Sequence, residues 1–179
     1  SKVCDHVIPA ESIEIVEMSK VIENLSRDVN IAFVNELALF AQSIGIEINK
    51  VIAVANTHKR VKLLSPGPGV GGYCIPNAYY YLSNVEGPKR SLPLSYQSRT
   101  FNEAIPEEIV QIAEKTLLLN QIKPEKAVFA LFGMGMKDFS NDLRHSPSVM
   151  VYELLIKRGY QVRTYDPITD WENKDTSHS

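Results

Sequence analysis

The sequence predicts a mixed α and α/β protein, in which an all-helical central domain with one long dimerisation helix precedes a partial Rossmann-like βαβ domain. Three observations predict this fold class. Residues 12–44 repeat apolar side chains at helical spacing, residues 65–76 are dense in Gly and Pro, and residues 127–132 form a short apolar run. We therefore expect a helical domain over 1–122, an α/β domain over 123–168 and a disordered tail over 169–179.

The first predicted helix occupies 12–44, where no Gly or Pro interrupts the apolar pattern. Ser12 suits its N-cap and Gly45 its C-terminal stop. At 1.5 Å per residue such a helix is on the order of 50 Å long, which exceeds the diameter of a small domain. Because a compact chain of 179 residues could not cover this rod alone, we expect a homodimer formed along it. A second helix should follow over 47–57.

The remaining elements follow from local signals. The segment 65–76 must be a loop, and a polar break through Gly87 and Pro88 separates residues 77–82 from a helix over 94–119. The apolar run 127–132 is typical of a buried parallel strand. A helix over 147–158, with Ser146 as N-cap, and a strand over 161–165 complete one βαβ unit. One such unit leaves a sheet edge unpaired and a core half built.

Composition excludes several functions. The chain has 19 Lys and Arg against 21 Asp and Glu, and a net charge of -2 gives no general reason to bind nucleic acid or an acidic membrane. No apolar run approaches the roughly 20 residues that span a bilayer, and the first residues are not a secretory signal. We expect a cytoplasmic protein. Cys4 and Cys74 form no metal-binding spacing, so no metal site is expected, and the missing initiator Met suggests a piece of a longer chain.

The string from Gly67 to Gly72 satisfies G-x-G-x-x-G, but its context argues against a dinucleotide site. A nucleotide-binding fingerprint needs a strand before it and a helix after it, whereas here a helix precedes and Pro66 and Pro68 lie at the entrance. Residues 133–135 follow a strand, yet Asp138 stands where the third Gly belongs. Neither string should bind NAD unaided.

Cys74 ends the glycine loop, where a thiol would be presented to another molecule. It is either a nucleophile, activated by a nearby cation, or a small buried side chain, which is the commoner fate of a free cysteine. Cys4, close to the N-terminus, is expected to be structural.

Polar side chains interrupt the long helix and follow the first strand. Lys20 and Asn24 are i,i+4 neighbours, and Asn35 lies about three turns further along. These residues form either a solvated face or a site that uses their amides, because Asn costs a helix stability. After the strand, Lys137 and Arg144 suit a phosphate or carboxylate, or else make surface salt bridges.

Three segments together resemble the UDP-glucose/GDP-mannose dehydrogenase family. Glu17, Lys20 and Asn24 are similar to the family's E-x-x-K-x-x-x-N helix. Residues 58–61 and 66–76 are similar to its catalytic cysteine loop, and residues 136–147 with 165–167 to the start of its C-terminal domain. The residue pattern of this loop looks most like that of the branch of the family that acts on UDP-N-acetylhexosamines such as UDP-N-acetylmannosamine.

The resemblance implies an oxidoreductase that oxidises the C6 alcohol of a UDP-sugar to a carboxylate, with two successive hydride transfers to NAD+. Cys74 would form a thiohemiacetal and then a thioester, while Lys20 and Asn24 hold the oxyanion and orient water. Residues of the glycine loop and two cationic side chains, those of Arg60 and Lys137, would bind the substrate. The implied set is Arg60, Ser65, Gly67, Gly69, Gly71 and Lys137, with Met136 beside the nucleotide and Arg144 reaching toward the dinucleotide.

Two departures from the family pattern leave an alternative open. No counterpart of the family's N-terminal dinucleotide-binding domain is present, and the C-terminal domain stops after one βαβ unit. The family also places an Asp four residues after the cysteine, where this chain has Ala78. The alternative is therefore a non-catalytic module for dimerisation or nucleotide-sugar binding.

Overall fold

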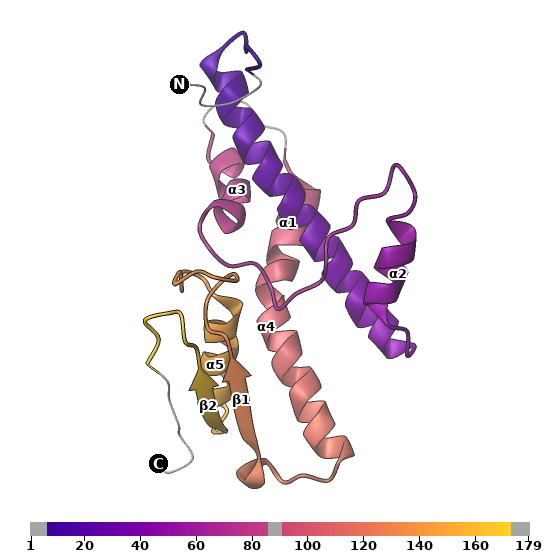
Figure 1. The fold of residues 1–179 in the computed structure, drawn as a ribbon, viewed down its shortest axis with the longest axis vertical. Helices are drawn as coiled ribbons and strands as arrows, with labels where there is room; N and C mark the ends of the chain where they lie inside the picture. Colours follow the sequence, from indigo (N-terminus) through magenta and orange to yellow (C-terminus); the bar gives the residue numbers. More distant parts are fainter. Residues whose placement is uncertain (1–6, 86–90, 173–179) are drawn as a thin grey trace.

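A computed structural model describes residues 7–85 and 91–172 of the chain. Within these residues the order is α1, α2, α3, α4, the short 3-10 helix η1, β1, α5 and β2. Figure 1 shows an upper part built on the long helix α1 and a lower part built on the two strands, with α4 running from one to the other. The predicted fold class, a helical part followed by a partial Rossmann-like α/β part, is confirmed.

Helix α1 (Ile13–Ser43) has the bounds that the sequence predicts. Ser12 is its N-cap, and Gly45 follows its end at φ +72, a left-handed conformation that Gly adopts without steric cost. Its second half packs against α4, but much of its apolar surface remains uncovered. The exposed apolar side chains of α1 include Ile13, Ile15, Val16, Met18, Ile22, Phe33 and Phe40. Helix α2 (Ile48–Ala55) is slightly shorter than predicted.

Helix α3 (Cys74–Ser83) begins earlier than the sequence suggested. We expected loop as far as residue 76, because Pro usually ends regular structure. Pro76 instead occupies the first turn, where a backbone N–H would have no intrahelical acceptor, so its missing N–H costs nothing. The expected break at Gly87 and Pro88 lies outside the described residues, as does Cys4.

Helix α4 (Pro93–Leu119) matches the prediction and starts with Pro93. It also contains Pro106 in its interior. Because Pro has no N–H, the carbonyl of Asn102, four residues earlier, has no partner within the helix. Both residues are buried against the rest of the molecule.

The lower part is one βαβ unit. Strands β1 (Val128–Phe132) and β2 (Gln161–Tyr165) are parallel, with Val128 opposite Gln161. Helix α5 (Pro147–Lys157) joins them, and η1 (Pro124–Lys126) precedes β1. Four buried residues from α4, α5 and β2 form the core on one face of this sheet. They are Val110, Val151, Leu155 and Val162.

The prediction that the first strand is buried was wrong. Val128 is 45% exposed and Phe132 is 79% exposed. Among the described residues, α4 and α5 cover one face of the two-stranded sheet, so the side chains of β1 that point away from them meet solvent.

Part of the chain after β2 contacts the α/β unit through Thr169 and Trp171. Of the predicted disordered tail 169–179, the structure describes residues as far as 172. Thr169 N donates to Asp166, and Trp171 Nε1 donates to Thr164 Oγ1 at 3.0 Å. The Trp171 ring also packs edge-on against Tyr152. An aromatic side chain with two such contacts holds this part of the tail against the α/β unit.

No helix in the described part of the chain could cross a membrane.

Candidate active site

Cys74 is the first residue of α3, and its side chain is exposed. The structure therefore does not bury the thiol, which removes one of the two readings of the sequence. Tyr73 and Tyr81 lie beside it. A hydrogen bond with Tyr73 raises the pKa of the Tyr81 hydroxyl, and the nearby Cys74 adds to this effect. The same thiol lies close enough to Arg144 to help raise the pKa of that guanidinium, after the larger effect of Asp142.

The glycine loop that leads to Cys74 is packed against protein. A Cβ atom added at Gly71 would lie 2.8 Å from Met136 Cβ and 2.9 Å from the His145 carbonyl oxygen. A Cβ atom at Gly69, where φ is +125, would lie 3.3 Å from the Asn102 carbonyl oxygen. Gly67, by contrast, has open space around it. Two of the predicted substrate-binding glycines therefore allow close packing between parts of the chain.

One hydrogen bond ties this loop to the α/β unit. Gly72 N donates to the Arg144 carbonyl oxygen at 2.8 Å. Cys74 is thus two residues from a contact with the loop that follows β1. The glycine string has no strand before it, and the positions of Gly69 and Gly71 are filled by protein atoms, so this loop does not form a cradle for a dinucleotide.

Asn35 uses its side-chain amide in hydrogen bonds, one of the two alternatives that the sequence left open for the Asn residues of the long helix. Its Oδ1 accepts from Gly67 N at 2.9 Å, and its Nδ2 lies 3.4 Å from Asn102 Oδ1. Asn24 is half-buried on the same helix. Lys20 is exposed and forms an ion pair with Glu23 at 2.8 Å. Although α3 packs against α1, this ion pair directs Lys20 along its own helix.

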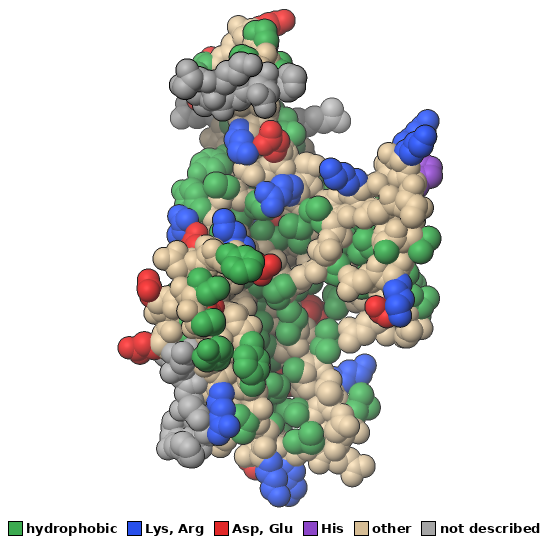
Figure 2. Space-filling view, viewed as in Figure 1, with side chains coloured by type: hydrophobic (Ala, Val, Ile, Leu, Met, Phe, Trp, Pro, Cys, Tyr) green, Lys and Arg blue, Asp and Glu red, His purple; other side chains and the backbone are tan. Residues whose placement is uncertain are grey.

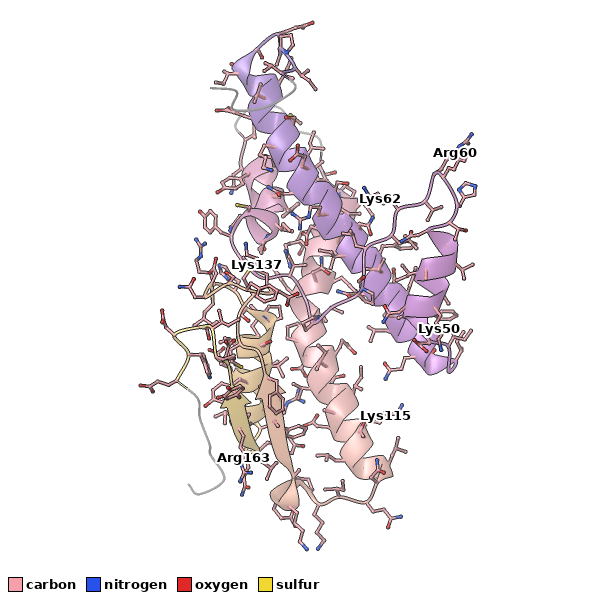
Figure 3. All side chains as sticks on the ribbon, in the orientation of Figure 1. Lys50, Arg60, Lys62, Lys115, Lys137 and Arg163 are labelled. Carbon is pink, nitrogen blue, oxygen red and sulfur yellow. The ribbon has the colours of Figure 1, made fainter. Side chains whose placement is uncertain are left out.

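Arg60 lies apart from Lys137, the other cation among the predicted substrate residues (Figure 3). It is exposed at the tip of the loop beyond α2, and Figure 3 shows it pointing away from the molecule, across α1 from Lys137. Ser65 is exposed at the start of the glycine loop. Within one chain, the structure does not bring Arg60 and Lys137 together.

A hollow of about 510 Å³ lies beyond the carboxyl ends of the two strands. Met136, Lys137 and Asp166 line it together with Pro68 of the glycine loop. Figure 2 shows hydrophobic side chains gathered on this side of the α/β unit. The exposed apolar residues here are Phe132, Phe139, Tyr165 and Ile168. A cation beside apolar and aromatic surface suits a ligand with a phosphate and a flat ring.

Asp166 organises the floor of this hollow. Its two carboxylate oxygens accept from the backbone N–H groups of Met134, Gly135, Ile168 and Thr169. Burial by itself would raise the pKa of Asp166, but these four donors outweigh it and hold the pKa well below its usual range. Sequence reasoning assigned this residue no role, although its position directly after β2 was the signal that could have found it.

Asp142 and Arg144 form a two-bond ion pair at the rim of the site. Arg144 Nε lies 2.9 Å from Asp142 Oδ1, and Arg144 NH2 lies 2.7 Å from Asp142 Oδ2. The hydrogen bond from Arg144 lowers the pKa of Asp142 to about 2. The predicted alternative of surface salt bridging thus applies to Arg144. Among the described residues, no group of three or more His, Cys, Asp or Glu side chains could hold a metal ion.

Comparisons with known proteins place both parts of the chain in one family. Residues 14–104 match the model of the UDP-glucose/GDP-mannose dehydrogenase family, central domain. Residues 130–178 match the model of that family's UDP binding domain. The first match spans the long helix, the glycine loop and Cys74, and the second spans the hollow at the strand ends.

Curated relatives and solved structures agree with these matches. A UDP-N-acetyl-D-mannosamine dehydrogenase from Pyrococcus horikoshii is 41% identical over 152 residues, which are 84% of this chain and 36% of the relative. An NDP-N-acetyl-D-galactosaminuronic acid dehydrogenase from Ralstonia nicotianae is 36% identical over 79% of this chain and 32% of its own. The chain thus spans about a third of the length of the curated relatives it matches.

Two solved structures share the fold. The UDP-D-ManNAc dehydrogenase of Pyrococcus horikoshii superposes with a TM-score of 0.81 and 38% identity, over 92% of this chain and 38% of that one. The UDP-N-acetyl-mannosamine dehydrogenase of Staphylococcus aureus superposes with a TM-score of 0.76 and 33% identity, over 90% of this chain and 36% of that one.

Proposed function

Because this chain belongs to the UDP-glucose/GDP-mannose dehydrogenase family, we propose that it is the central and partial C-terminal portion of a UDP-sugar 6-dehydrogenase. The substrate is UDP-N-acetylmannosamine or a similar UDP-sugar, as the names of two archaeal relatives indicate. The complete enzyme oxidises the C6 alcohol of this sugar to a carboxylate. The domain division at residue 122 belongs to the same proposal.

One observation carries the proposal. The glycine loop places Cys74 next to the segment that carries Met136 and Arg144, through the hydrogen bond from Gly72 N to the Arg144 carbonyl. A nucleotide bound at the strand ends would therefore extend its sugar toward an exposed thiol. An enzyme that traps a sugar aldehyde covalently needs that proximity.

Cys74 supplies the nucleophile. Its sulfur adds to the C6 aldehyde, a C–S bond forms, and the thiol proton ends on the former carbonyl oxygen to give a thiohemiacetal. After oxidation to a thioester, water attacks the carbonyl carbon, the C–S bond breaks and the free thiol and carboxylate result. Lys20 and Asn24 stabilise the oxyanion in these steps, for which Lys20 must exchange its exposed pairing with Glu23 for the substrate.

The resemblance implies NAD as the hydride acceptor for both oxidations. The residues of this chain do not form its cradle, because the G-x-G-x-x-G string is closed by protein atoms at Gly69 and Gly71. Arg144 can reach a dinucleotide with its NH1 edge, since Asp142 holds the Nε and NH2 edge.

The UDP group is assigned to the hollow at the strand ends. Lys137 is exposed there and can meet a phosphate, while Met136 and the neighbouring aromatic side chains offer apolar surface to the base. Ser65 and Gly67 remain open to the sugar at the start of the glycine loop, whereas Gly69 and Gly71 shape that loop by their packing.

The proposed homodimer forms along α1. Two hollows of about 510 Å³ and 450 Å³ lie on α1, and residues of α4 complete both. Ile22 and Phe33 lie in this surface and are each about half exposed. Association would cover it, and Arg60 could then meet a substrate bound to a second copy.

Ala78 favours a second candidate, a binding module without turnover. Its side chain is 1% exposed on α3, so the carboxylate expected from the family pattern is replaced by a buried methyl group. Water attack on the thioester would then lack a base. A module of this kind would bind the UDP-sugar, and a thioester formed on Cys74 would persist without releasing acid.

Calorimetry tests the nucleotide site that both functions share, and two measurements on Cys74 separate the functions. Calorimetry of the chain with UDP, UDP-N-acetylmannosamine and GDP-mannose tests the nucleotide site, and the proposal requires UDP compounds to bind and the GDP compound to bind more weakly. In the complete enzyme, Cys74→Ser should abolish acid formation, and full activity of that variant would disprove the cysteine mechanism. A stable covalent adduct on Cys74 by mass spectrometry favours the module without turnover.

A further inference from the structure

A chain of buried polar side chains crosses the contact between α1 and α4. Asp28, Asn35, Arg99 and Asn102, here called the polar relay, are each 2% exposed or less. Arg99 NH1 lies 3.1 Å from Asp28 Oδ1, and Asn102 Nδ2 lies 2.7 Å from the same oxygen. Asn102 Oδ1 in turn accepts from Asn35 at 3.4 Å, the longest link. The relay ends at the glycine loop, where Asn35 Oδ1 accepts from Gly67 N at 2.9 Å.

The orientation of both amides is fixed from the two ends. Gly67 N–H can only donate, so the oxygen of Asn35 must face it and the nitrogen must face Asn102. At the other end Asn102 Nδ2 also donates to the backbone oxygen of Asp28, which can only accept, at 2.9 Å. Both constraints give the same orientation, so each link from the Gly67 amide to Asp28 donates in the same direction, away from the loop.

This arrangement is expensive to bury. Asp28 Oδ2 has no hydrogen-bond partner among the described residues, and burial raises the pKa of Asp28 more than Arg99 lowers it. An apolar helix contact of the same volume would avoid these costs. Apolar residues could not make the hydrogen bond from Asn35 to the Gly67 amide, which ties the helices to the glycine loop.

The glycine loop meets both parts of the molecule within six residues. Gly67 is held by Asn35, Gly69 sits against the Asn102 carbonyl that Pro106 leaves without a helical partner, and Gly72 bonds to the Arg144 carbonyl. The relay residue Asn102 therefore touches the loop with its backbone and, through Asn35, also with its side chain.

We propose that Asn35 and Asn102 are positioning residues, which hold the glycine loop between α1, α4 and the α/β unit so that the nucleotide-sugar site stays assembled. The effect on the loop stands on the geometry alone, whereas the effect on the ligand rests on the proposed function. Asn35 and Asn102 act in series, so loss of either one frees the same segment.

Amide hydrogen exchange measured by mass spectrometry tests the position of the loop without any ligand. Asn35→Leu should speed exchange of the amides at 69–73 roughly fivefold, the factor for one hydrogen bond of ordinary net strength. Asn35→Leu combined with Asn102→Leu should speed it no more than the faster single variant. Unchanged exchange at 69–73 in Asn35→Leu, or effects that multiply in the double variant, would overturn the proposal.

Asn30 provides a matched control on the same helix. It makes the same pair of bonds to the chain upstream of the loop, accepting from Leu64 N at 2.9 Å and donating to the Lys62 carbonyl at 3.0 Å. Asn30→Leu should speed exchange near 62–64 and leave 69–73 within about twofold of the wild type. An equal effect of both variants at 69–73 would mean general destabilisation and not positioning.

If Asn35→Leu and Asn102→Leu do not fold, two variants of Gly67 in the glycine loop test the same hydrogen bond. Gly67 lies in open space without a positive φ, so Gly67→Ala keeps the N–H and should exchange like the wild type. Gly67→Pro removes the donor and should reproduce the effect of Asn35→Leu at 69–73. Identical exchange in Gly67→Ala and Gly67→Pro contradicts the proposal.

Calorimetry with UDP separates this inference from the proposed function. If the wild type binds UDP, Asn35→Leu and Asn102→Leu should weaken binding at least fivefold and Asn30→Leu, on the same helix as Asn35, should not. Unchanged affinity in the first two variants would refute the positioning role. Failure of the wild type to bind UDP would refute the proposed function, while the exchange results would still decide whether the relay holds the loop.

Discussion

Single backbone contacts set the geometry of the candidate site. Asp166 accepts four backbone N–H bonds, and this arrangement fixes the turn after β1 relative to the turn after β2. Gly71 has no room for a side chain, because its neighbours are the Met136 side chain and the His145 backbone. Both residues therefore lend themselves to substitutions with a definite expected sign.

Asp166→Asn should lower the free energy of unfolding at pH 7 by about 2 kcal/mol, because hydrogen bonds to a charged acceptor are lost. The folded-state pKa of Asp166 lies below its unfolded value of about 3.9, so this stabilisation is present above that pH and is lost as the pH falls through the folded-state pKa. Urea unfolding should show a difference between the two proteins that shrinks below about pH 4. Asp170→Asn, an exposed change in the same segment, is the control, and an effect of equal size would contradict the assignment.

Gly71→Ala should cost about 2 kcal/mol of stability, because the new methyl group meets a backbone oxygen at 2.9 Å that has little room to move. Gly67→Ala places the same methyl group in open space and should be neutral. Thermal unfolding of the two variants is the measurement. Equal melting temperatures would show that the loop can move away from His145.

At the scale of elements, α4 is the piece that joins the two parts. Its first half packs on α1 and its second half on α5. Arg158, directly after α5, forms ion pairs with Glu107 and Glu114 of α4, and Tyr160 donates to Glu114 at 3.0 Å. Charges that form such a network on a partly exposed surface hold two elements in register more than they add stability.

Arg158→Met should lower the free energy of unfolding by about 1 kcal/mol at low salt, since it leaves two carboxylates of α4 without a cation. The difference should shrink at about 1 M salt, where the screening length falls to about 3 Å. Urea unfolding at the two ionic strengths measures both effects. Lys115→Met on the exposed side of α4 should change neither value, and a salt-independent loss would argue that packing of the Arg158 stem, and not its charge, is responsible.

The sequence was sufficient for most elements and for few of the contacts. Periodicity and Gly or Pro stops predicted α1, α4, α5 and both strands, because these signals are local. The start of α3 at Cys74 was not predicted, because Pro76 suggests a loop. Only tertiary packing places Pro76 in the first turn of a helix. Asp28, Arg99 and Asn102 could not be identified as a site, because residues about 70 positions apart meet only after α1 and α4 pack. Arg60 was grouped with the substrate residues by motif, yet a motif carries no information about where its loop points.

At the scale of the whole molecule, much apolar surface of α1 remains uncovered by the described chain. Ile13, Ile15 and Ile22 are each about half exposed or more, and a surface of this kind on a long helix marks a contact with another molecule. The proposed homodimer covers it with the same surface of a second copy.

Ile22→Asp should weaken that homodimer about a hundredfold, because it places an unpaired charge inside an apolar contact. Analytical ultracentrifugation over a concentration series measures the change. Leu118→Asp, at an exposed apolar position near the end of α4, should leave the dimer unaffected. A wild-type protein that sediments as a monomer at all concentrations would contradict the proposed dimer.

The passage of one helix through both parts also limits how the molecule can bend. A hinge between two domains usually lies in a linker, but here α4 is continuous from its packing on α1 to its packing on α5. Any rotation of the α/β unit must therefore flex this helix, and the strain will concentrate at Pro106, where a rung of the helical ladder is missing. Gly69 lies next to the Asn102 carbonyl, which loses its usual helical donor at Pro106. Bending of α4 at Pro106 would therefore shift the glycine loop that leads to Cys74. The position of the candidate nucleophile thus depends on the shape of α4.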